Sequence, residues 1–69
     1  MTDTDKIKKF IRMKGFTLET LAKEIGISRT TLSYKINNQV EFTANEIKKI
    51  QVALNLSDEQ RDKIFFRRE

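Results

Sequence analysis

The chain has 69 residues and contains no cysteine, histidine or proline, so disulfides, thiolate zinc sites and imidazole ligands are excluded. Its formal net charge is a modest +4, and no apolar run approaches the roughly 20 residues that a membrane span needs. We therefore expect one small domain over 1–69, built from packed helices, without a metal or cofactor. The polar N-terminus is unlike a signal peptide, which favours a cytoplasmic location.

The first predicted helix covers about 4–14. Ile7, Phe10 and Ile11 recur there at helical spacing, and Gly15 suits the left-handed position just beyond a helix end. The stretch 6–18 also lacks acidic residues and is rich in lysine. Such a run is usually a solvated surface, but it can also form an electropositive face for a polyanion.

Four further helices are predicted, each after a Ser or Thr that can accept a hydrogen bond from an unpaired backbone N–H. These caps are Thr17, Ser28, Thr43 and Ser57. Two of them have a Glu or Gln three residues later, which completes a capping box. In the last two helices Ile47, Ile50, Leu54, Ile64 and Phe65 are the expected core residues.

Three of these starts also have an apolar residue before the cap that can pack against an apolar residue inside the helix. The pairs are Phe16 with Leu21, Ile27 with Leu32, and Phe42 with Ile47. This recurrence predicts where each helix begins.

The helix after Ser28 has an unusual outer face. Each residue advances by about 100° around a helix, so Leu32 and Ile36 form one buried stripe. The opposite arc contains Arg29, Thr30, Ser33, Tyr34 and Asn37, with Thr31 and Lys35 at its far edge. The interval 25–40 has no Asp or Glu. Short polar side chains with a nearby arginine favour a helix that enters the major groove of DNA.

Each residue of this arc has a role that fits DNA. Arg29 can donate two hydrogen bonds to guanine or bind a phosphate, and Thr30 and Ser33 are short enough to permit close approach. Tyr34 can reach a phosphate with its hydroxyl. Asn37 can pair with adenine or, alternatively, cap the helix end. Ser28 caps the helix, whose free N–H groups favour a phosphate there.

The segment 16–38 resembles the helix-turn-helix of lambda-type Cro and repressor proteins. Ala22 and Gly26 match the family's alanine and turn glycine, and the sequence 26–33 matches the start of its recognition helix. The later part of the chain is similar to short phage Cro-like proteins at residues 35–38, Phe42, Glu46, Ile47, Leu54, Leu56 and 64–66.

This resemblance implies an all-α, five-helix lambda-repressor-like domain, with the motif at about 17–37, that binds double-stranded DNA and acts as a transcriptional repressor. The candidate DNA-binding residues are Thr17, Ser28, Arg29, Thr30, Ser33, Tyr34, Lys35, Asn37 and Asn38. One position departs from the family pattern. Where the family often has a glutamine that contacts phosphate, this chain has Leu18, so that contact is lost or moves to Thr17 or Thr20.

Other functions fit the sequence less well. Without histidine, cysteine or a glycine-rich phosphate loop, an enzyme is not expected. A single tyrosine on a helix is no stacking platform for single-stranded RNA. The main alternative is a protein-interaction module, antirepressor or antitoxin-like, which would expose apolar residues such as Leu18, Val40, Phe42 and Phe66. A weak homodimer on DNA is also expected, through the C-terminal segment that contains Phe65 and Phe66.

Overall fold

Five α-helices follow one another along the chain in the computed structural model, which describes residues 1–67. They are α1 Thr4–Met13, α2 Leu18–Ile25, α3 Arg29–Ile36, α4 Ala44–Ala53 and α5 Asp58–Phe65. Within 1–67 there is no β-strand, so the predicted all-α fold and its five helices are confirmed. None of these helices is long and apolar enough to cross a lipid bilayer.

The predicted caps explain where four of the helices begin. Thr17, Ser28, Thr43 and Ser57 each accept a hydrogen bond from the backbone N–H three residues later. Both predicted capping boxes form. A third forms at α2, where the Thr20 hydroxyl accepts from the Thr17 N–H at 2.8 Å. The sequence did not signal it, because a capping box is normally recognised by Glu or Gln at that position.

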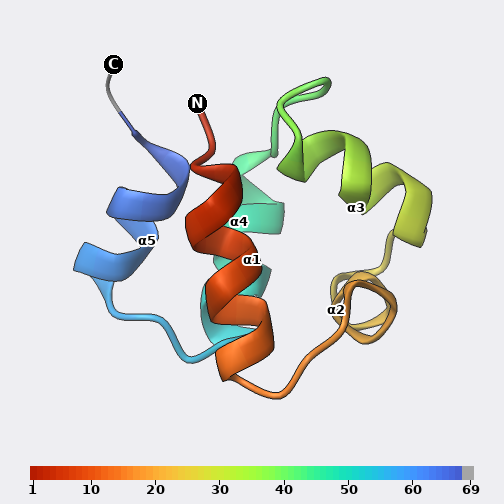
Figure 1. Ribbon diagram of the computed structural model, residues 1–69, viewed down its shortest axis with the longest axis horizontal. Helices are drawn as coiled ribbons and strands as arrows, with labels where there is room; N and C mark the ends of the chain where they lie inside the picture. Colours follow the sequence, from red (N-terminus) through yellow and green to blue (C-terminus); the bar gives the residue numbers. More distant parts are fainter. Residues whose placement is uncertain (68–69) are drawn as a thin grey trace.

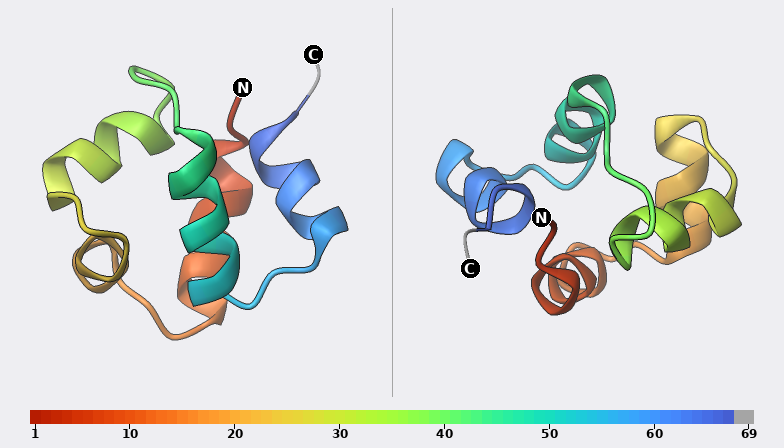
Figure 2. Two further views of the ribbon diagram at one scale, coloured as in Figure 1. Left: turned by 180° about the vertical axis from the view of Figure 1, so that it is seen from behind. Right: turned by 90° about the horizontal axis from the view of Figure 1, so that it is seen from above.

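The helices surround one core. In Figure 1, α5 lies on one side of α1 and the pair α2–α3 on the other. The view from above in Figure 2 separates α1 and α4 to opposite sides of the molecule, with α5 and the α2–α3 pair between them at either end. This arrangement leaves α3 at the periphery, packed mainly against α2.

Side chains from every helix fill the centre. The buried apolar residues are Ile7, Ile11, Leu21, Ala22, Ile25, Leu32, Ile36, Ile50, Leu54, Leu56, Ile64 and Phe65. All the expected core residues of the last two helices are among them except Ile47, which is half-buried and packs against the cluster. Phe42 meets Phe65 edge to face, with ring centroids 5.2 Å apart. Burial of this set supplies the main driving force for folding.

The first residues of the chain lie between the ends of α3 and α5. The Asp3 N–H donates to the Ile64 carbonyl at 2.7 Å, and the Thr4 hydroxyl donates to the Ile36 carbonyl at 2.7 Å. The Arg67 N–H donates to the Met1 carbonyl at 3.2 Å. The N-terminal segment thus joins the last turn of α3 to the last turn of α5.

Candidate nucleic-acid interface

The turn between α2 and α3 is built around Gly26. This residue has φ of 82°, in the left-handed region, where a glycine has no steric penalty. The N–H groups of Gly26 and Ile27 both donate to the Ala22 carbonyl, at 2.9 and 3.0 Å. These bonds close the end of α2, and Ser28 then starts α3. So short a turn leaves α3 little freedom to change its orientation relative to α2.

The buried and exposed faces of α3 agree with the helical wheel. Leu32 is 0 % exposed and Ile36 1 % exposed, so the predicted buried stripe is confirmed. Tyr34 is half exposed. On the outer face the exposed residues are Arg29, Thr30, Tyr34 and Asn37, while Thr31 and Ser33 are half-buried. The face is therefore polar or amphipathic along its length. Its contact with DNA stays a prediction.

Lys35 does not lie on this outer face, and the expectation that it sits at an outward edge is wrong. It is 7 % exposed, and its Nζ donates to both carboxylate oxygens of Glu46, at 2.6 and 2.7 Å. The spacing along α3 does not show which residues of other helices the side chain can reach. The flexible side chain turns inward, because α4 brings a carboxylate within its reach.

The same carboxylate has a perturbed pKa. Burial raises the pKa of Glu46, but the hydrogen bonds from Lys35 and from the Thr43 backbone, together with the Lys35 charge, lower it by more. The net pKa lies below the ordinary glutamate value. Glu46 is thus held as the charged partner of Lys35.

Asn37 and Asn38 are both used within the protein. The Asn37 side-chain amide donates to the Ser33 carbonyl at 2.9 Å, which is the capping role that was one of its two predicted alternatives. Asn38 has φ of 64° and bonds Thr2 twice: its Oδ1 accepts from the Thr2 N–H and its Nδ2 donates to the Thr2 carbonyl, both at 2.9 Å. Both side-chain groups of Asn38 therefore hold the N-terminal segment, a role that the sequence did not indicate.

The starts of α2 and α3 present their caps to solvent. Thr17 and Ser28 are exposed. Their hydroxyl oxygens accept from the backbone at 3.1 Å, while the first N–H groups of each helix remain available to an anion. Leu18 packs against the core, which agrees with the loss of the polar contact that the family often makes at this position.

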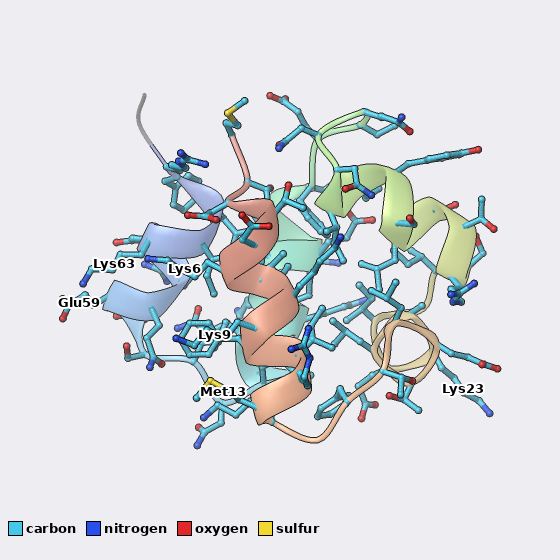
Figure 3. The ribbon with its side chains drawn as sticks, in the orientation of Figure 1. Lys6, Lys9, Met13, Lys23, Glu59 and Lys63 are labelled. Atoms are coloured by element: carbon cyan, nitrogen blue, oxygen red, sulfur yellow. The ribbon has the colours of Figure 1, made fainter. Side chains whose placement is uncertain are left out.

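Two lysines of the first acid-free stretch lie on the side of α1 that faces α5. Lys6 and Lys9 line a groove between α1 and α5 together with Lys63. Figure 3 shows these labelled side chains, with Glu59, on the side of the molecule away from α3. The positive charge of the outer α3 face comes from Arg29. No ion pair involves Arg29 within residues 1–67.

Comparison with known proteins adds one finding. The family model described as Helix-turn-helix matches residues 7–60, from α1 into α5. No curated protein matches the chain. The match contains the whole of α2, the Gly26 turn and α3, so the family's defining unit coincides with the geometry described above.

Proposed function

Because this chain belongs to the lambda repressor and Cro type of helix-turn-helix proteins, a family of DNA-binding transcription regulators, we propose that α3 reads the sequence of its operator in the major groove. The observation that carries this proposal is the division of α3: Leu32 and Ile36 are buried, and a polar face with Arg29 at one end is exposed. This face has no acidic residue, and its arginine and short polar side chains are those that a helix needs to enter the major groove.

The roles of the outer residues follow from their length and position. Arg29 donates to guanine O6 and N7 or to a phosphate, and Thr30 contacts a neighbouring base edge or thymine methyl. Ser33 lies half-buried in the middle of the face, so the helix backbone can approach the base pairs closely. Tyr34 directs its hydroxyl to a phosphate.

Phosphates on either side fix the register of the helix. Thr17 and Ser28 each stand at a helix start whose free N–H groups and positive dipole end favour an anion. At the other end of α3, the Asn37 amide nitrogen donates one hydrogen bond to the Ser33 carbonyl and has a second N–H that can donate to a phosphate. Lys35 and Asn38 make their side-chain hydrogen bonds inside the protein, to Glu46 and Thr2, and so hold α3 in place without contacting DNA.

The chain acts, in this proposal, as a short phage Cro-like repressor that occupies promoter DNA as a weak dimer. Phe66 is 57 % exposed, beside the half-buried Phe42 and Ile47. These three residues, with Met1, define an apolar face between the end of α5 and the start of α4. A second copy that covers this face places two α3 helices on two half-sites. The same face is where a protein partner of the alternative interaction module would bind.

Selection from a random pool of duplex DNA tests the proposal. We expect enrichment of a defined motif, and binding to that motif that weakens steeply with salt, by about 0.9 in the log–log slope for each phosphate contacted. Single-stranded DNA and duplex RNA of the same sequence are the matched controls. The absence of an enriched motif, or an affinity that does not change with salt, would overturn the proposed function.

A further inference from the structure

A nearly buried ion pair connects the proposed recognition helix to α4. Lys35 lies in the last turn of α3 and Glu46 in the first turn of α4. Their side chains are 9 % and 14 % exposed, and the Lys35 Nζ contacts both carboxylate oxygens. Among the ion pairs found in residues 1–67, it is the one that joins two helices.

Glu46 is itself fixed by a second set of bonds. Its Oε1 accepts from the Thr43 N–H at 2.9 Å, and its own N–H donates to the Thr43 hydroxyl at 3.1 Å. The carboxylate is therefore anchored to the start of α4, and the position of α4 is set in turn by the buried Ile50 and Leu54. Because the Glu46 carboxylate is held in this way, it fixes the position of the Lys35 ammonium. It thereby also constrains the last turn of α3.

The N-terminal segment also holds this end of α3, through Thr4 and Asn38, but the ion pair is what links it to α4. Leu32 and Ile36 press α3 onto the core, but apolar contacts are non-directional and fix rotation and tilt less tightly than charge-assisted hydrogen bonds. The segment 37–43 that leads to α4 is irregular. The Lys35–Glu46 pair spans that segment directly.

We propose that Lys35 and Glu46 are positioning residues for operator recognition, which set the placement of the last turn of α3 and so determine base discrimination without touching DNA. This inference rests on the proposed function, since it concerns the residues that α3 presents, chiefly Ser33, Tyr34 and Asn37. Hydrogen bonds to base edges depend steeply on distance and angle, so a small shift of α3 weakens correct contacts more than nonspecific ones.

If the Lys35–Glu46 pair only stabilised the fold, a different result would be expected. Replacing a buried ion pair by uncharged residues of similar size is often neutral for stability, whereas removing one partner leaves an uncompensated charge. The double variant K35M/E46Q removes both charges together. It preserves the net charge and keeps a Gln that can complete the capping box with Thr43. The variant is therefore expected to fold and to melt as the parent does.

If Lys35 itself bound a phosphate, the result would again be different. Lys35 would then have to leave Glu46 on binding, and its removal would lower the salt slope by about one phosphate equivalent. The matched control is K63M/E59Q, which removes the exposed Lys63–Glu59 pair of α5, 3.2 Å apart. Figure 3 shows that pair on the side of the molecule away from α3.

The experiment measures affinity for the selected operator, for a mismatched operator and for random duplex, each over a salt series. For K35M/E46Q we expect about a tenfold loss on the operator relative to K63M/E59Q. Binding to random duplex and the salt slope should not change. K35R, which can keep the carboxylate contact, should retain most of the discrimination. If K35M/E46Q unfolds, K35Q/E46Q, whose two amides can hydrogen-bond to each other and leave no uncompensated charge, replaces it and should show a smaller loss of the same kind.

Three results would overturn the inference. Equal operator discrimination in K35M/E46Q and K63M/E59Q would show that the pair does not position α3. A lower salt slope with an unchanged preference for the operator would show that Lys35 binds a DNA phosphate. If K35Q/E46Q, used in place of an unfolded K35M/E46Q, discriminated as the parent does, the pair would serve stability alone. Failure of the parent itself to prefer any sequence would instead overturn the proposed function.

Discussion

Arg29 is the residue through which α3 presents positive charge to its outer surface. It is exposed in the first turn of α3, and no hydrogen bond or ion pair of its side chain is found within residues 1–67. An arginine in this state retains all its donors for a ligand. Its planar fork can donate two parallel hydrogen bonds to O6 and N7 of one guanine in a fixed geometry.

We predict that Arg29→Ala weakens operator binding by roughly 1–3 kcal/mol and relaxes the preference at one base pair. The variant should keep its helical signal and its melting temperature, because Arg29 is exposed. Competition binding with single-base operator variants measures the effect, and Lys63→Ala controls for the loss of one positive charge. A uniform weakening at every position would mean that Arg29 binds only phosphate.

Glu46 makes the stability of the fold depend on pH. Its pKa is lowered in the folded protein, so the stabilisation it gives is present above the ordinary glutamate pKa, about 4.3, and is lost as the pH falls through the folded value. We predict that Glu46→Gln costs stability at about pH 7 and much less at about pH 3. Urea midpoints at both pH values are the measurement, with Glu59→Gln as the exposed control. An equal cost at both pH values would contradict it.

The residue scale is also where prediction from the sequence succeeded least. The spacing of Leu32 and Ile36 gave the buried face of α3, because that spacing depends on one helix alone. The places of Lys35 and Asn38 depend on Glu46 and Thr2, which are distant in the sequence. Nothing in the pattern of α3 indicates which side chains neighbouring elements bring. Whether the remaining candidates contact DNA stays a prediction.

At the scale of the elements, local chemistry determined the helix boundaries. Caps at Thr17, Ser28, Thr43 and Ser57 act within one turn, so a reader of the sequence can find them. The turn at Gly26 is equally local. The box formed by Thr17 and Thr20 was missed because threonine seldom takes that role.

We predict that Leu32→Ala destabilises the domain by about 2–5 kcal/mol, since Leu32 is fully buried and its removal leaves a cavity. A loss of that size is comparable to the whole stability expected of a domain this small. Thermal melting followed by circular dichroism measures it, and Met13→Ala, at a site 63 % exposed, is the control. Melting of the Leu32 variant at the parent's temperature would mean that α3 is packed differently.

At the scale of the whole molecule, contacts between distant segments decide the arrangement. The N-terminal segment bonds to the ends of both α3 and α5. These bonds could not be predicted from the sequence. They involve backbone groups, which every residue has, and Asn38, whose left-handed conformation the sequence does not reveal. The apolar face around Phe66 belongs to the same end of the molecule.

We predict that Phe66→Ala abolishes cooperative binding to two half-sites about 34 Å apart and leaves binding to one half-site nearly unchanged. The reason is that Phe66, the residue that caps the end of α5, is exposed on the apolar face and is not part of the outer face of α3. Gel-shift titrations on one-site and two-site probes measure the effect. Val52→Ala removes an exposed apolar side chain of α4 as the control. Independent filling of both half-sites by the parent protein would rule out the dimer.

Amide chemical shifts, mapped while the isotope-labelled protein is titrated with its selected operator duplex, show which residues meet the DNA. If the outer face of α3 reads the bases, the largest changes fall on α3 and on the starts of α2 and α3, around Thr17 and Ser28. The groove that contains Lys6 and Lys63 should then change little. Changes centred on that groove between α1 and α5, with α3 unaffected, would show that α3 is not the reading helix.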